Sequence, residues 1–266
     1  MIKYDLKNQD YHDHPAVSWT GLKRFLISPH HYKNPKPRVE DHFLNVLHLM
    51  IFEPEKFKSE VAVIEGDFRK KENKIIRDQA IEKGLYIIKK EQEQEIKQIA
   101  ENVSKLPEAD AFIKLGKSEV SIITKNKEYG FEYKCRCDSI IFDKKMFIDG
   151  KSFYPLTFGA VKSQVARMSY HLQLAHYTNV LKDETGLDFR SLLLFFESKI
   201  PYQARFVKID QEDINFARQA LRSIYKRYAD CLEKNSWPSY GSEIMTVKIP
   251  QYSIDDLSFM ISKEFE

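Results

Sequence analysis

The sequence contains few cysteines, little excess charge and no long apolar run. Its three cysteines, two of them at Cys135 and Cys137, are too few for a structural zinc site and fit free thiols in a reducing compartment. A net charge of +3 excludes a polycation that coats nucleic acid, so any contact with nucleic acid has to be local. No apolar run approaches the roughly 20 residues that span a bilayer, and nothing resembles a signal peptide. We therefore expect a cytoplasmic protein with no membrane partner.

Two common sequence signatures of enzymes are missing as well. No Gly-x-Ser-x-Gly elbow is present, and Cys135 and Cys137 lie in a predicted strand, which argues against serine and cysteine hydrolases. The tripeptide Gly150-Lys151-Ser152 lacks the upstream glycine of Gly-x-x-x-x-Gly-Lys-Ser, so it does not predict a phosphate-binding loop.

The composition and the hydrophobic pattern predict one folded domain over residues 1–266. A hydrophobic content of 42%, with 13% aromatic residues, is enough for a substantial core, and no repeat, low-complexity tract or linker stands out. Apolar spacing predicts helices over residues 18–26, 40–52, 67–84, 90–106 and 210–235. It predicts strands over residues 85–88, 117–124, 131–140, 146–151, 189–196 and 204–209. Prolines and basic residues between 29 and 38 predict a connecting loop or a local DNA contact.

Two acidic residues and a lysine are predicted to lie on neighbouring strands. In residues 131–140 a period of two places Asp138 on a charged face, opposite the apolar face that carries the cysteines. After a polar turn, Asp149 and Lys151 are two residues apart and therefore share a face of the next strand.

This grouping predicts a divalent metal site. Two neighbouring carboxylates disfavour each other's ionisation unless a cation lies between them. Magnesium fits, because it takes oxygen ligands and is usually held by one or two carboxylates together with substrate phosphate oxygens. A lysine beside the metal stabilises the extra negative charge of a phosphate in the transition state. Further along, Gln173 and Tyr177 share a helix face at i, i+4 and are candidates to hold a phosphate or a water.

The order Asp138, then Asp149-Gly150-Lys151, then Gln173-x-x-x-Tyr177 resembles the PD-(D/E)xK nuclease superfamily, in the branch of RecB-type nuclease domains and exonuclease VIII. Three flanking stretches also look like this branch: the opening over residues 11–32, the histidine helix over 47–55 and the closing motif over 237–241. Two departures are Leu44, where the family often has glycine, and Ser152, where it often has threonine. Neither removes a catalytic group.

The resemblance implies an α/β fold with a central mixed β-sheet flanked by helices and a restriction-endonuclease-like core. The implied parts are a helical N-terminal part (1–115), a catalytic core (117–209) and a C-terminal helix and tail (210–266). The implied catalytic residues are Asp138, Asp149, Lys151, Gln173 and Tyr177. The implied metal ligands are Asp138, Asp149 and the Gly150 carbonyl, with His48 and Glu119 in second place.

In function, the resemblance implies a magnesium-dependent exodeoxyribonuclease, with manganese able to substitute. Such an enzyme digests linear double-stranded DNA from an end, 5′ to 3′, and leaves single strands for an annealing recombinase. The resemblance also implies a ring-shaped homo-oligomer in a bacterial or phage-infected cell.

Several alternatives stay open at the level of the sequence. A histidine beside an apolar helix face, such as His48, is more often a core residue than a ligand, and only the resemblance favours the ligand. Glu119 is either a third acidic ligand or an exposed strand carboxylate. For the whole chain, the alternatives are a non-catalytic DNA-end-binding or assembly protein on the same fold, an endonuclease, or an RNA nuclease.

Overall fold

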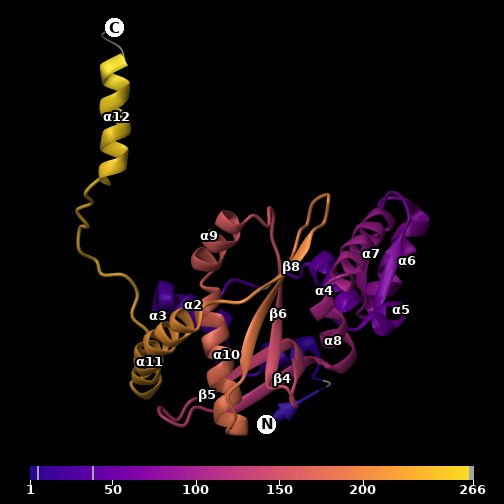
Figure 1. Ribbon diagram of the computed structural model, residues 1–266, viewed down its shortest axis with the longest axis horizontal. Helices are drawn as coiled ribbons and strands as arrows, with labels where there is room; N and C mark the ends of the chain where they lie inside the picture. Colours follow the sequence, from indigo (N-terminus) through magenta and orange to yellow (C-terminus); the bar gives the residue numbers. More distant parts are fainter. Residues whose placement is uncertain (5, 38, 264–266) are drawn as a thin grey trace.

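A computed structural model of the chain describes residues 1–4, 6–37 and 39–263. Within those residues the centre of the fold is a six-stranded sheet with the strand order β1-β4-β5-β6-β7-β8 (Figure 1). The strands are β1 (Ile2–Lys3), β4 (Lys117–Lys125), β5 (Glu132–Ile141), β6 (Met146–Ser152), β7 (Arg190–Phe196) and β8 (Ala204–Val207). Strands β6 and β7 are parallel and the other neighbours are antiparallel. The predicted α/β class with a central mixed sheet is therefore confirmed.

One face of the sheet packs against α10 (Tyr170–Thr185), which in turn packs against α11 (Gln211–Glu233). Helix α2 (Trp19–Ile27) lies beside α11 on the same side (Figure 1). The chain reaches this face from β6 through α9 (Phe158–Met168) and returns to the sheet at β7. The first core lies here, and its largest fully buried side chains include Tyr133, Phe25, Phe147 and Phe195.

The other face carries a second core, covered by α4 (His42–Phe52), α7 (Lys90–Ser104) and α8 (Pro107–Leu115). A small parallel sheet of β2 (Val61–Ile64) and β3 (Tyr86–Lys89) joins this layer. The remaining elements on this side are a 3₁₀ turn at Pro54–Lys56, α5 (Phe57–Glu60) and α6 (Lys71–Glu82). Strand β6 lies between the two cores, with Phe147 in the first and Ile148 in the second, whereas β5 packs mainly in the first core and reaches the second at Ile141.

Side-chain caps explain where several helices begin. Ser18 accepts a hydrogen bond from Gly21 N at 3.3 Å at the start of α2, and Asp41 accepts one from Leu44 N at 3.1 Å at the start of α4. Asp210 does the same at the start of α11. Each cap satisfies a backbone N–H that the first helical turn leaves without a partner.

Two predictions about local structure were wrong. Residues Pro29–Lys33 form the short helix α3 and not a connecting loop, because Ser28 caps His31 N at 3.2 Å and proline fits the first helical position. The part expected to be helical, residues 1–115, contains the predicted strand at β3, but it also contains β1 and β2, which were not predicted, as well as α1 (Asn8–Asp13). Strands β1 and β2 have four residues or fewer, which is too short for a clear period of two.

The chain ends in α12 (Gln251–Lys263), which lies apart from the rest of the fold (Figure 1). In the described residues, no helix combines the length and the apolar character that crossing a membrane requires. The division of the chain into a single domain stays a prediction.

Candidate active site

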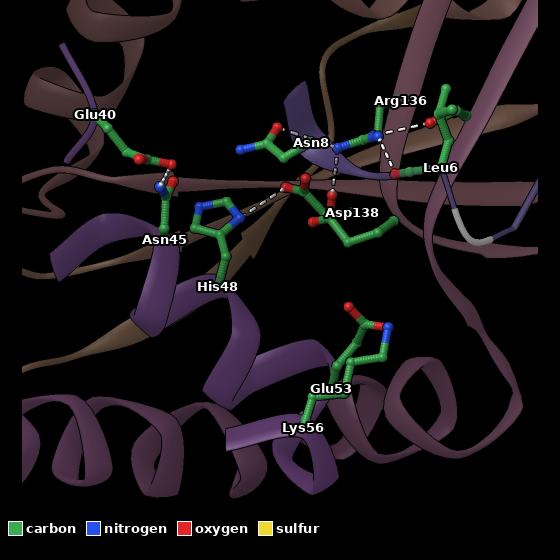
Figure 2. Close-up of polar contacts among 11 residues, drawn as sticks. Leu6, Asn8, Glu40, Asn45, His48, Glu53, Lys56, Arg136 and Asp138 are labelled. Carbon is green, nitrogen blue, oxygen red and sulfur yellow. Dashed lines mark hydrogen bonds and ion pairs between the residues drawn. The ribbon is translucent and has the colours of Figure 1, made fainter. Parts of the chain in front are cut away.

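The side chains of Asp138 on β5 and His48 on α4 approach each other beside the sheet. His48 Nδ1 lies 3.5 Å from Asp138 Oδ2, and Figure 2 shows the imidazole pointing from α4 toward the carboxylate. The same oxygen accepts a hydrogen bond from Gly150 N of β6 at 2.6 Å. Asp138 is thus fixed by one group from a helix and one from the neighbouring strand.

Gly150 allows this close approach. A β-carbon at this position would lie 3.3 Å from Asp138 Oδ2, 3.3 Å from His48 Cε1 and 3.2 Å from Phe196 Cε1. All three contacts are tighter than ordinary van der Waals contact, so a larger residue would push the carboxylate and the imidazole outward. The backbone N–H of Gly150 points to Asp138, while the expected role of its carbonyl as a ligand stays a prediction.

Glu119 reaches the same place through an irregularity in β4. Val120 packs in the first core, whereas Ser118 donates its hydroxyl to the carbonyl of Phe52 beside the second core at 2.7 Å. Residues two apart in a regular strand share a face, so the strand changes face between them. Glu119 has a φ of +50°, a left-handed conformation that costs a non-glycine residue about 1 to 3 kcal/mol. The partner strand changes face at Asp138, which lies between the pairs Ser118–Ser139 and Val120–Cys137, because Cys137 packs in the first core and Ser139 donates to the carbonyl of Phe112 beside the second core.

The three side chains form a set that fits a divalent cation. One ligand atom each from His48, Glu119 and Asp138 lie within 4.8 Å of one another. Carboxylate oxygens are the ligands that Mg²⁺ and Mn²⁺ prefer, and imidazole adds a neutral nitrogen donor. This places His48 and Glu119 beside Asp138, whereas their role as ligands stays a prediction.

Asp149 and Lys151 of β6 form a buried ion pair beside this set. Lys151 Nζ contacts Asp149 Oδ2 and lies 4.9 Å from the ring centroid of Tyr170. Asp149 is 3% exposed, and its Oδ2 accepts no well-directed hydrogen bond from the residues that the structure describes. A buried carboxylate oxygen with only an ammonium group beside it still has lone pairs that a cation can use.

Gln173 and Tyr177 of α10 have different positions relative to the carboxylates. Gln173 Nε2 donates to Asp149 Oδ1 at 3.1 Å and to Tyr177 Oη at 3.2 Å. Tyr177 therefore stands behind Gln173 and packs against Phe147, with 5.9 Å between ring centroids. The i, i+4 spacing brings the two residues together as expected, but Gln173 alone of the pair contacts a site carboxylate among the described contacts.

Burial and mutual charge set the pKa values of these groups in different directions. Burial and the charge of Asp138 raise the pKa of Asp149 to about 6, against the opposing effect of Lys151. Burial also acts to raise the pKa of Asp138, but the charges of His48 and Lys151 outweigh it, so the pKa is lowered. Burial and the charge of Asp138 raise the pKa of Glu119 to about 7. A cluster of acids with pKa values spread apart is typical of a functional site.

Arg136 is a residue of this site that the sequence did not single out as functional. Its Nη1 lies 3.6 Å from Glu119 Oε2, and its other bonds go to Ser121 Oγ at 2.9 Å, Asn8 Oδ1 at 3.2 Å and the Leu6 carbonyl at 2.7 Å. Figure 2 shows these N-terminal partners around the guanidinium. Arg136 stands two residues before Asp138 on its charged face, and this spacing was the signal available in the sequence.

A separate cavity of about 380 Å³ lies between the β4–β5 turn, α10 and α11. Its lining includes Tyr133, Lys182 and Arg218, and it shares no lining residue with the cluster around Asp138. This cavity is therefore separate from the candidate site.

Comparisons with known proteins bear on the family and the fold. Residues 18–249 match the family described as a PDDEXK-like domain of unknown function (DUF3799). The crystal structure of a candidate exonuclease from Eubacterium rectale is similar over 96% of this chain and 99% of its own, with 13% identity and a TM-score of 0.61. The crystal structure of a phage-related exonuclease from Haemophilus somnus 129PT matches over 86% of this chain and 100% of its own, with 13% identity and a TM-score of 0.34. No curated protein sequence matches the chain. At this identity the first similarity shows a shared fold, and the second is too weak to add to it.

Proposed function

This chain belongs to the family of PDDEXK-like domains, and from that premise we propose that it is a magnesium-dependent exodeoxyribonuclease acting on linear double-stranded DNA. The family confirms the predicted PD-(D/E)xK superfamily and makes the chain a nuclease-type domain. The choice of cation, the DNA substrate and attack from an end are parts of the proposal.

The single observation that carries the proposal is the arrangement of Asp138, Asp149 and Lys151. The two carboxylates stand on neighbouring strands, the charge of Asp138 raises the pKa of Asp149, and the ammonium group contacts Asp149. In a non-catalytic scaffold, a buried lysine beside two acids that bind a cation would be unfavourable, because the ammonium group and the cation repel each other at this range. A nuclease uses the lysine when phosphate charge builds up.

The residues present fit a divalent cation, and His48, Glu119, Asp138 and Asp149 are those that would hold it. When bound, such a cation acts as a Lewis acid on the phosphate and makes its bound water more acidic.

The other roles belong to side chains. Lys151 Nζ donates to the oxygen that gains charge in the transition state, and Gln173 Nε2 holds Asp149 Oδ1 in place. Arg136 pairs with Glu119, and its charge opposes the rise in the pKa of that carboxyl group that burial and Asp138 cause.

The finer parts of the proposal follow from resemblance. The similar Eubacterium rectale protein is described as a candidate exonuclease, which favours attack from an end over internal cleavage. We extend to this chain the 5′-to-3′ direction, the annealing recombinase as a partner and the ring-shaped homo-oligomer that the sequence resemblance implies. A cytoplasmic location in a bacterial or phage-infected cell belongs to the same proposal.

The test is cleavage of labelled nucleic acids by purified protein. Linear duplex labelled at the 5′ or the 3′ end, covalently closed circular duplex and duplex RNA are each incubated with Mg²⁺ or with a chelator. We expect Mg²⁺-dependent loss of the linear DNA alone, with the 5′ label released first.

A matched pair of variants on one hairpin serves as the control. Asp149→Asn removes a buried site carboxylate, and Asp143→Asn removes an exposed carboxylate from the turn that precedes β6. Asp149→Asn should abolish cleavage and Asp143→Asn should leave it unchanged. Cutting of the circular duplex would contradict exonuclease action, and DNA binding without cleavage would favour a scaffold.

A further inference from the structure

Exposed apolar side chains follow the ends of β6 and β7 in the chain, with Tyr154 and Phe158 after β6 and Ile200 after β7. We call Tyr154, Phe158, Lys199 and Ile200 the apolar rim. Phe158 is 81% exposed, Ile200 77% and Tyr154 43%, although all three are large and hydrophobic. Lys199 Nζ lies 5.2 Å from the ring centroid of Tyr154, which joins the two loops that carry these residues. Single exposed apolar residues are common on protein surfaces, but a group of them beside a candidate active site is not.

The backbone beneath the apolar rim is held firmly. The carboxylate of Glu197 is 5% exposed and accepts hydrogen bonds from Leu156 N and Gln203 N, each at 3.1 Å. Phe153 N donates to the carbonyl of Phe196 at 3.1 Å. One buried acid thus ties the loop after β6 to the β7–β8 hairpin. The exposure of the rim is therefore a fixed feature of the fold.

The rim lies next to the proposed catalytic groups. Strands β6 and β7 run parallel, and Lys151 pairs in register with Phe195. Tyr154 follows Lys151 by three residues, and three residues of extended chain span about 10 Å. Figure 1 shows α9, which begins at Phe158, and the β7–β8 hairpin on either side of the chain that leaves β6. The end of a DNA strand bound at Lys151 would therefore lie within one or two nucleotides of the apolar rim.

The chemistry of the rim does not fit the outside of a duplex. A duplex presents phosphates and sugars outward and keeps the faces of its bases stacked, so aromatic and aliphatic side chains gain little from it. Unpaired bases expose flat apolar faces, and stacking on an aromatic side chain contributes about 1 to 3 kcal/mol per base. Opening a terminal pair costs a few kcal/mol, which stacking on this scale offsets in part.

We propose that the apolar rim binds the unpaired bases at a duplex end and so separates the strand that enters the site from its complement. This inference rests on the proposed function, because it assumes that the chain acts on a DNA end. It adds that the DNA end is bound with its terminal bases unpaired. Phe158, as the most exposed aromatic of the four, carries most of the stacking. Lys199 is exposed beside Tyr154 and contacts the phosphates of the separated strand.

The test compares three substrates with the same sequence: a blunt duplex, a duplex whose last three pairs are mismatched, and the single strand. Phe158→Ala should lower the rate on the blunt duplex by about tenfold, and should change the rates on the other two by less than about twofold. Phe158→Trp should keep the wild-type rate on all three. Phe216→Ala, which removes a 70% exposed phenylalanine from α11, is the matched control and should have no effect.

A second measurement does not depend on cleavage. A blunt duplex carrying 2-aminopurine next to its end is titrated with the Lys151→Met protein, because the fluorescence of this base rises when it leaves the helix stack. The rise should occur with Lys151→Met and be lost when Phe158→Ala is added.

Three results would overturn the inference: equal losses on all three substrates, an unchanged rate on the blunt duplex, or a lower molar mass of Phe158→Ala in light scattering. The last would make the rim a contact between copies of the chain. If the wild type cleaves no substrate, the proposed function fails. The fluorescence titration then shows by itself whether the apolar rim binds unpaired bases.

Discussion

Replacement of Lys151 by methionine removes one ammonium group and keeps most of the apolar side chain. The side chain is 17% exposed and its end lies over the ring of Tyr170, so methionine can occupy the same space. The removal of one preorganised transition-state donor costs about a hundredfold in rate, which corresponds to about 2.7 kcal/mol. We expect Lys151→Met to fold and to lose cleavage on this scale.

A second effect of the replacement has to be separated from the first. The pKa of Asp149 is about 6, raised by burial and by Asp138, and Lys151 holds it down. Without the ammonium group the pKa of Asp149 rises further, so at pH 7 more of the carboxyl groups are protonated and fewer bind a cation. Part of the loss at pH 7 would then come from weaker metal binding. The loss that persists at pH 9 is the contribution of the ammonium group to the transition state.

The assay measures single-turnover cleavage of end-labelled linear duplex at pH 7 and pH 9 with saturating Mg²⁺, together with Mn²⁺ binding by calorimetry. Lys234→Met, an exposed lysine at the end of α11, is the matched control. If Lys151→Met binds Mn²⁺ at pH 9 and cleaves within about tenfold of the wild type, the proposed role of the lysine is refuted.

Four further predictions concern single positions. Asp138→Ala should abolish cleavage and weaken Mn²⁺ binding in calorimetry while the circular dichroism spectrum is kept; wild-type affinity would remove Asp138 from the metal site. Gly150→Ala should weaken Mn²⁺ binding by about tenfold, because its β-carbon meets two proposed ligand groups, Asp138 and His48, in close contact and displaces them; unchanged affinity in the same titration would show that the site relaxes freely. Gln173→Ala should raise the DNA concentration needed for half-maximal cleavage more than it changes the Mg²⁺ requirement, because an amide is a poor magnesium ligand; the opposite order would contradict this. His176 is fully buried, and burial lowers its pKa to about 4, below the ordinary 6.5. Its contribution to stability is complete above pH 6.5 and is lost as the pH falls toward 4, by up to about 3 kcal/mol, so urea denaturation should show a shallower loss between those pH values for His176→Gln than for the wild type.

The N-terminal segment adds to the site from outside the matched region of residues 18–249. The carbonyl of Leu6 and the side chain of Asn8 hold the guanidinium of Arg136, which pairs with Glu119. Lys134 of the same strand is buried, and its ammonium group donates to the backbone carbonyls of Tyr11 and His14. The charged face of β5 is thus covered by a segment that the family match does not include.

Local patterns were enough to predict the elements that carry the catalytic groups. A period of two along residues 131–140 predicted β5 with its cysteines in the core, and the Asp-x-Lys spacing predicted that Asp149 and Lys151 share a face. The i, i+4 spacing predicted the contact between Gln173 and Tyr177. These predictions succeeded because side-chain direction within one strand or helix depends on the backbone repeat alone.

Tertiary packing decided which of these groups form the site. The approach of His48 to Asp138 depends on how α4 packs against the sheet, and the space for both depends on the missing β-carbon of Gly150. Glu119 reaches the same cluster because its strand changes face at a left-handed residue, which no periodic pattern predicts.

The sequence by itself therefore determined which candidate residues share a face of one strand or helix, because periodicity is a local property of the chain. The tertiary structure decided how His48, Glu119, Asp138 and Arg136 meet, because segments separated by up to 130 residues come together only when both cores form around the sheet.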